Sequence, residues 1–453
     1  MAQTLTTGPV AGNLRDQSAP MAMGLLAIFS FEAVDLFFIS RLGVEALAAA
    51  SFALPVIWLL SAIGIGFETG ASSCVSRAVG RGDQRQARRL TTDAAVLGFL
   101  AASTVCVVGL LTIRPLFTIL GATEETLPLI EEYMGIWYFV EPVATVLWIC
   151  LASIRARGNT LLEGKVITAA AFINAVLDPI LIFGLLGLPP LGIRGAALAS
   201  LIANLLMLAF TLIYLIRHLG VMASPFAPLR ELLDSSRRIL TIGVPATITH
   251  SIAPISHAIA VAMAAVYGVS AVAGFGIAMR IEGIALILFF ALAAVSSPFF
   301  GQNLGAGLYG RLSEARRVAL WFCLGFGVLL ALGLDLGAHA LAGLFTDSAA
   351  VRQVAVEYIW IVSGSYGAYG LAMVSIDSFN GLGAPIPATT LSILAILVFL
   401  PLALFGRGLL GLNGLFGAIA VANGVVGLAA FYWLGQRLRS LSGGRQRTSL
   451  RST

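Results

Sequence analysis

Residues 167–186 read ITAAAFINAVLDPILIFGLL, an apolar run long enough to cross a bilayer as one helix. Asn174 and Asp178 are four residues apart, so they share one face of that helix. Pro179 has no N–H and leaves the carbonyl oxygen of Ala175 without its helical donor. The run therefore offers a carboxylate, an amide and a free carbonyl, oxygen groups that can hold a proton or a small hard cation. The alternative is structural, with Asn174 in helix packing and Asp178 hydrogen-bonded to a neighbour.

Similar apolar runs recur along the whole chain. Of 453 residues, 58% are hydrophobic and 11% are charged, whereas a soluble protein carries roughly 25% charged residues. This composition predicts an all-α polytopic membrane protein with twelve transmembrane helices, and it argues against a soluble enzyme. We expect no nucleic-acid partner, because the arginines lie between the apolar runs. The expected spans are 20–41, 45–78, 90–113, 124–154, 162–187, 191–216, 239–267, 270–300, 313–344, 350–380, 386–406 and 413–436.

The basic residues predict the orientation of these spans. The chain has 27 lysines and arginines. Five of them fall on one side of the expected membrane, namely Arg41, Arg114, Arg194, Arg352 and Arg407. Arg280 lies inside a span, and the other 21 fall on the opposite side. Because lysine and arginine accumulate in cytoplasmic loops, both termini are expected to be cytoplasmic.

The sequence also repeats itself. GVEALA at 43–48 matches GVSAVA at 268–273, and GAALA at 195–199 matches GAIAV at 417–421. Six spans per half give both halves the same orientation, so we expect two parallel six-helix repeats. The predicted parts are a cytoplasmic tail at 1–19, a first lobe at 20–217, a cytoplasmic linker at 218–238, a second lobe at 239–436 and a basic cytoplasmic tail at 437–453. The linker is predicted to carry a separate amphipathic helix on the membrane surface.

The two halves differ in their polar residues. In the repeat register, Asp35, Asn174, Asp178 and Ser200 fall on Ala260, Ile396, Leu400 and Ala422. Pro179, in contrast, recurs as Pro401. Residues that both halves need for helix packing should recur in both, and the proline does recur. The extra polar groups therefore favour a site in the first half alone.

These polar groups converge on one depth. Counted from the outer ends of their spans, Asp35, Tyr133, Asp178 and Ser200 lie about 9–14 Å below the outer surface. With Asn174 they form the expected cation or proton site, and sodium could bind at Asp35, Asn174 and Asp178. Two ionised carboxylates would lack a basic neighbour here, so protonation of one is favoured. Tyr133 could instead be an interfacial tyrosine.

Several motifs together resemble the multidrug and toxic compound extrusion (MATE) family, and within it the DinF-like branch. They are Pro20, Asp35, FISRLGVEALAA at 38–49, GRGDQRQARR at 80–89, NAVLDP at 174–179, GIRGAALAS at 192–200 and GQNLGAG at 301–307. The resemblance covers about residues 15–437. It implies that Asp35, Tyr133, Asn174, Asp178 and Ser200 form a cation or proton network in the first lobe. Ser200 stands where a threonine is usual, which keeps the hydroxyl. The resemblance also implies two rocking lobes and a first span that bends at Pro20.

The expected function is export of organic, cationic or amphipathic compounds, driven by inward proton or sodium movement. Candidate residues of the substrate cavity are Glu32, Trp137, His257 and Asp377, although Glu32 could equally pair with a neighbour. No cofactor is expected beyond the coupling ion. The partners would be small organic substrates and lipids, and the protein a monomer in a bacterial or archaeal cytoplasmic membrane. The rivals are a lipid-linked oligosaccharide flippase and a non-transporting receptor. The sequence contains no GxxxxGK[ST] pattern, which argues against an ATP-driven pump.

Other charged residues within the spans have no assigned role at this point. Glu68 and Glu141 lie in spans two and four. Arg280 and Glu282 are two residues apart and do not share a helix face, so we expect each to have a different partner in a structural ion pair. His250 and His257 share a face and are interpreted as hydrogen-bonded core histidines.

Overall fold

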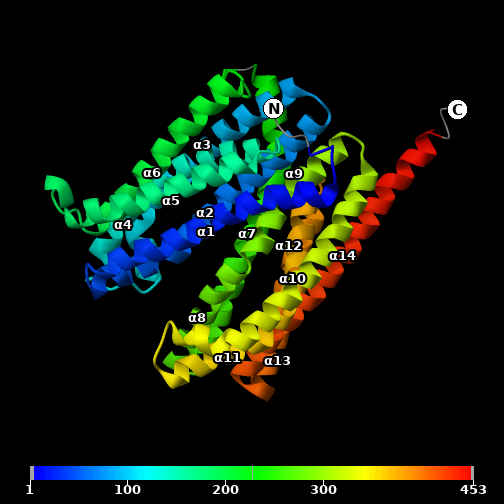
Figure 1. The fold of residues 1–453 in the computed structure, drawn as a ribbon. Coiled ribbons are helices and arrows are strands. Elements are labelled where there is room, and N and C mark those ends of the chain that lie inside the picture. Colours follow the sequence, from blue (N-terminus) through cyan, green and yellow to red (C-terminus); the bar gives the residue numbers. More distant parts are fainter. Residues whose placement is uncertain (1–4, 227, 450–453) are drawn as a thin grey trace. The chain divides into compact units, whose positions relative to one another are not determined.

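The computed structural model describes residues 5–226 and 228–449, with side chains described up to Ser442. This part of the chain contains helices and no strand (Figure 1). The helices are α1 (Val10–Ser40), α2 (Val44–Gly80), α3 (Gln84–Ile119), α4 (Leu127–Arg155), α5 (Thr160–Phe183), α6 (Ile193–Ile213), α7 (Leu229–Ala265), α8 (Val269–Ala285), α9 (Ile287–Gly305), α10 (Tyr309–Gly343), α11 (Ala349–Val362), α12 (Tyr366–Gly381), α13 (Pro385–Leu410) and α14 (Leu412–Ser449). Twelve segments among the described residues are long and apolar enough to cross a membrane. The prediction of a twelve-span helical membrane protein is confirmed.

Some helix boundaries differ from the predicted ones. α1 begins at Val10, well before the expected start of the span at 20. The eighth span is divided at Leu286 into α8 and α9, and a short 3-10 turn at Ser363–Ser365 separates α11 from α12. The separate surface helix predicted in the linker is wrong, because α7 runs unbroken from Leu229 through the apolar segment. No glycine or proline lies between Leu229 and Ile242 to end it.

The chain divides into two compact units. Among the described residues, one unit, here called the N-lobe, contains residues 20–226 and 228–250, and the other, here called the C-lobe, contains residues 5–19 and 251–449. The division at 250 falls inside α7 rather than in the predicted linker, and a second division falls inside α1 before Pro20. Both helices are therefore shared between the units.

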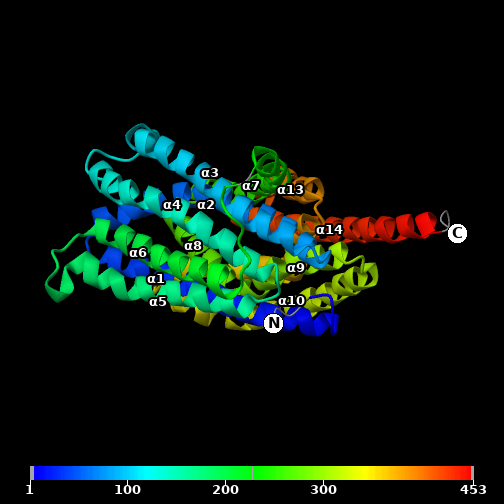
Figure 2. The ribbon, with the colours of Figure 1, turned by 90° about the horizontal axis from the view of Figure 1, so that it is seen from above.

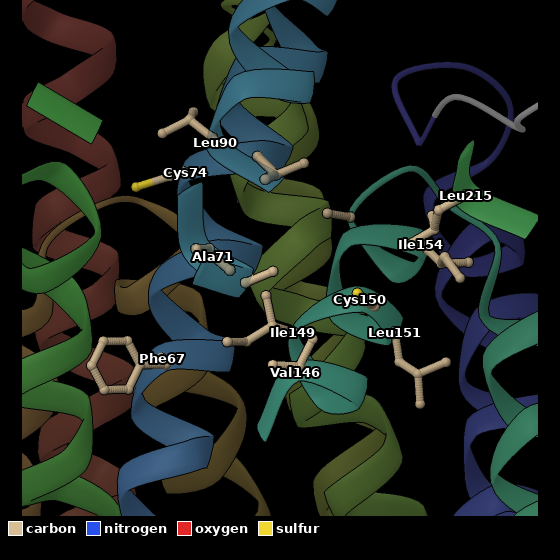
Figure 3. Packing of buried hydrophobic residues seen from close by; sticks show 14 of the residues in the cluster. Phe67, Ala71, Cys74, Leu90, Val146, Ile149, Cys150, Leu151, Ile154 and Leu215 are labelled. Carbon is tan, nitrogen blue, oxygen red and sulfur yellow. The ribbon is translucent and has the colours of Figure 1, made fainter. Parts of the chain in front are cut away.

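The N-lobe is organised around α4, which packs against α2, α3 and α6, while α5 packs on α6. Figure 2 shows α3, α4 and α6 in succession across this lobe. One part of this lobe is filled by a buried cluster that includes Phe67 and Ala71 on α2 and Ile149 and Ile154 on α4 (Figure 3). The close-up shows Ile149 extending from α4 toward α2, while Phe67 and Ile154 lie on the other sides of their helices, so the core packs around both helices.

The C-lobe repeats this arrangement, with α12 packed against α9, α10, α13 and α14. It also holds residues 5–19. The GQNLGAG motif supplies Gln302, whose Oε1 accepts from the Leu5 backbone N–H at 2.9 Å, and Asn303, whose Nδ2 donates to the Leu5 carbonyl at 3.2 Å. Arg311 donates to the carbonyls of Leu5 and Gly8 at 3.1 and 2.7 Å. The motif therefore anchors the N-terminal segment to the C-lobe.

Candidate functional site

Most of the apolar run 167–186 belongs to α5, and the two candidate site residues within it are buried. Asn174 is 3% exposed and Asp178 is 0% exposed. Asn159 begins the helix by accepting from the Leu162 N–H at 3.2 Å. Gly184 ends it in a left-handed conformation, with φ 73°, that glycine adopts without strain. Pro179 lies inside the helix, so the carbonyl of Ala175 lacks its usual donor.

Asn174 links α5 to α6 through Ser200. The Asn174 amide lies 2.9 Å from Ser200 Oγ. When the amide is oriented to satisfy all its neighbours, Nδ2 donates to Asp178 Oδ2 at 3.0 Å, and the amide oxygen accepts from the Ser200 N–H and hydroxyl at 2.9 Å each. The structure therefore brings Asn174, Asp178 and Ser200 into one hydrogen-bonded group.

The close approach of α5 and α6 depends on a glycine. A Cβ at Gly195 would lie 2.6 Å from the carbonyl carbon of Leu181 and 2.7 Å from the nitrogen of Ile182. The connecting loop is tied down as well, because the Leu191 N–H donates to the Leu181 carbonyl at 3.0 Å. Only a residue without a side chain lets the two helix backbones come this close.

Asp35 on α1 and Tyr133 on α4 interact with this group electrostatically. Electrostatic interactions join Asp178 to Asp35, and Tyr133 to both carboxyls. Tyr133 is 6% exposed, so it is a buried residue of the lobe rather than one at the lipid interface. Asp35 Oδ1 is buried and has no hydrogen-bond partner among the described residues. All five predicted site residues thus belong to the N-lobe.

The four candidate cavity residues lie in different units. Glu32 and Trp137 belong to the N-lobe, where Glu32 is exposed and interacts electrostatically with Asp35, and Trp137 is half-buried. His257 and Asp377 belong to the C-lobe, where His257 is exposed and Asp377 accepts from the Asn380 amide at 3.4 Å. The interpretation of His257 as a core histidine is wrong, since its side chain is exposed.

A second polar cluster of the N-lobe was missed by the sequence analysis. Arg155 at the end of α4 binds Glu163 on α5 at 2.5 Å and also forms an ion pair with Glu68 on α2. Arg155 and Glu163 are 5% and 0% exposed. Arg155 lies just outside the expected span 124–154, yet it is buried between two acids. Glu141, also unassigned before, accepts from the Thr145 hydroxyl at 3.2 Å.

The C-lobe holds a carboxyl that the sequence analysis assigned to an ion pair. Glu282 Oε2 accepts from the hydroxyls of Tyr358 at 2.5 Å and Tyr366 at 3.1 Å. Arg280 is exposed, and no ion pair joins it to a described acid. The two residues do have different surroundings, as expected. The expected structural ion pair is wrong for both.

Comparisons with known proteins agree with this architecture. The family model MatE matches residues 20–180 and 245–405. The two matches begin at 20 and 245, and the repeated motifs GVEALA and GVSAVA begin at 43 and 268. Both separations are the same, so the matches follow the internal repeat. A FAD transporter of Shewanella oneidensis is 35% identical over 436 residues, covering 96% of each chain. The multidrug export protein MepA of Staphylococcus aureus is 26% identical over 435 residues, covering 95% of each chain.

Solved structures agree as well. A crystal structure of the Vibrio cholerae MATE transporter VcmN superposes with a TM-score of 0.91 and 31% identity, over 97% of this chain and 99% of that one. The relatives are transporters and not enzymes. With its repeated family match and its twelve candidate spans, the chain belongs to the MATE family of integral membrane transporters.

Proposed function

We propose that the chain is an antiporter that exports organic compounds while protons move inward through the N-lobe site. The observation that carries the proposal is the hydrogen-bonded group of Asn174, Asp178 and Ser200, which faces an Asp35 carboxyl with an unpartnered buried oxygen. A carboxyl in such a setting is a group that gains a partner when a proton or a cation arrives.

Electrostatics support a site that takes up positive charge. The charged groups that act on these carboxyls are themselves acids, Glu32 on Asp35 and Asp35 on Asp178. Two carboxylates that both stay ionised in a partly dry lobe repel each other and lack a counter-charge, whereas protonation of one relieves the repulsion. Binding drives transport only if it favours one conformation of the protein over the other.

The orientation of Asn174 supports protons over sodium. Carboxylates of Asp35 and Asp178, the Ser200 hydroxyl and the Ala175 carbonyl offer oxygen atoms that suit a hard cation. In the satisfied orientation, however, Asn174 directs its N–H toward Asp178 and its oxygen toward Ser200. A sodium ion beside Asp178 would meet an amide N–H and would require the amide to turn. A proton on Asp35 requires no such change.

The proposal also covers the membrane, the hinge and the substrate of the transporter. The 21 basic residues on one side support cytoplasmic termini in a bacterial or archaeal cytoplasmic membrane. Pro20, which lies inside α1 where the two units divide, would act as the hinge of a monomeric transporter. The relatives suggest two kinds of substrate, FAD and drugs, and the sequence alone favoured cationic or amphipathic compounds.

Efflux from proteoliposomes tests the proposal. Vesicles in sodium-free buffer are loaded with FAD or with ethidium, a cationic dye, and a pH gradient is imposed. We expect the wild-type protein to move at least one of them and the gradient to be required. Transport that stays silent until sodium is added would refute proton coupling while leaving export intact. No movement under either gradient would refute export itself.

A further inference from the structure

Arg280 lies within the eighth expected span, at 270–300, and the proposed proton mechanism does not use it. It lies on α8, three turns after Val269 and about 16 Å along the helix axis. On an insertion scale, an arginine at the centre of a membrane helix costs about 2.5–3.5 kcal/mol, and such residues usually face a bundle interior or water. Its presence therefore needs a reason.

The packing of α8 places Arg280 away from the interior of the C-lobe. The buried residues of α8 are Ala271, Gly274, Phe275, Ala278 and Ile281, and α8 packs mainly on α11. At 3.6 residues per turn, Arg280 lies on the side of the helix opposite to these residues. It shares that side with exposed Ala273 and Ile284. Its guanidinium is thus presented outward from the lobe between apolar neighbours.

The nearest acid along the helix cannot neutralise Arg280. Glu282 lies on the buried side, where its carboxyl accepts from Tyr358 and Tyr366. No ion pair joins Arg280 to any acid among the described residues. A guanidinium without an internal partner keeps its planar set of donors for an external anion, and this set matches phosphate oxygens in pairs.

The internal repeat shows that the fold does not need this arginine. In the register that aligns 43–48 with 268–273, Arg280 falls on Pro55 of α2. The equivalent helix of the N-lobe therefore forms without a basic residue at this place. A group that is costly in a membrane, unpaired, and absent from the matching helix indicates a role in binding.

We propose that Arg280 is a substrate-recognition residue that binds the phosphate groups of an anionic organic substrate, of the dinucleotide class to which FAD belongs. The inference rests on the proposed export function and narrows its substrate. It predicts that the pyrophosphate, rather than the flavin ring, distinguishes good substrates from poor ones. An anionic lipid headgroup presents the same phosphate chemistry, so the test must separate the two sources.

Binding measurements on the purified protein test this residue directly. Equilibrium dialysis in detergent compares FAD with riboflavin, which carries no phosphate, for the wild type, Arg280→Gln, Arg280→Lys and Arg407→Gln. We expect Arg280→Gln to weaken FAD binding about ten- to a hundredfold, the range for loss of charged hydrogen bonds. Riboflavin binding should not change, Arg280→Lys should keep part of the affinity, and Arg407→Gln, a loop arginine of the same lobe, should bind like the wild type.

The contrary outcomes are distinct. FAD binding that is absent from the wild type or unchanged in Arg280→Gln would overturn the assignment, and so would an equal loss of riboflavin binding. If the only effect of Arg280→Gln is that the protein in nanodiscs no longer responds to phosphatidylglycerol, Arg280 binds a lipid headgroup instead. Wild-type protein that exports ethidium but does not bind FAD would overturn this inference alone. Protein that binds FAD through Arg280 and exports nothing would overturn the proposed export function alone.

Discussion

Replacing Gly195 with alanine should disable the proposed proton site without touching any of its polar groups. The added Cβ would lie 2.6 Å from the carbonyl carbon of Leu181, whereas non-bonded carbons rest about 3.5–4.0 Å apart. The two helix backbones must therefore separate by about 1 Å. If α5 and α6 move as rigid bodies, the contact of 2.9 Å between Asn174 and Ser200 opens to about 3.9 Å, beyond the hydrogen-bond range.

The expected result is a protein that folds but couples poorly. Overpacking of this kind costs about 1–3 kcal/mol, so thermal melting in detergent should fall by a measurable amount while the protein stays monodisperse. Efflux driven by a pH gradient should fall at least about tenfold, since losing one factor of ten needs only about 1.4 kcal/mol. Gly135→Ala on α4 is the matched control, because its Cβ would meet nothing within 4 Å. Wild-type efflux by Gly195→Ala would refute the link between helix spacing and the site.

Three further predictions follow from the two lobes. Asp35→Asn should abolish gradient-driven efflux, whereas Ala260→Asn at the matched C-lobe position should reduce it far less; similar losses would show that the site or the repeat register is wrong. Arg155→Met leaves Glu68 and Glu163 without their counter-charge and should lower the free energy of unfolding by about 3–5 kcal/mol, with an unchanged melting curve as the contrary result. Single cysteines at 122 and 408 should react with impermeant reagents outside intact cells, and those at 84 and 309 should not; the native cysteines are buried and should stay silent.

The sequence pattern predicted which polar residues gather in the N-lobe, because their placement depends mainly on local helix geometry. The i,i+4 spacing of Asn174 and Asp178 and the rise of a helix are enough to assign a face and a depth. The internal repeat then distinguished residues common to both lobes, such as the proline, from the polar residues that occur in the first lobe alone. The bond between Asn174 and Ser200 joins residues 26 positions apart on neighbouring helices, and the shared depth already pointed to it.

Other features depend on tertiary contacts that no local pattern reveals. Glu282 meets tyrosines 76 and 84 residues away, and the choice between a tyrosine and an arginine as partner is made by helix packing. Arg155 lies at the end of α4, where span counting treats it as a loop residue, yet acids from α2 and α5 surround it. The segment just before α1 is held by a distant contact as well, because the Leu5 backbone N–H donates to Gln302 of the C-lobe, 297 residues away.

The most direct test of the proton site is a count of protons displaced by substrate. Purified protein in weakly buffered, sodium-free detergent solution is mixed with a compound that it exports, and a pH indicator reports released protons. Because proton and substrate must oppose each other's binding in an antiporter, the wild type should release protons on mixing, and Asp178→Asn should release none while still binding the compound. Equal release from Asp178→Asn and the wild type, or no release from the wild type, would contradict the central claim that the N-lobe carboxyls carry the coupling proton.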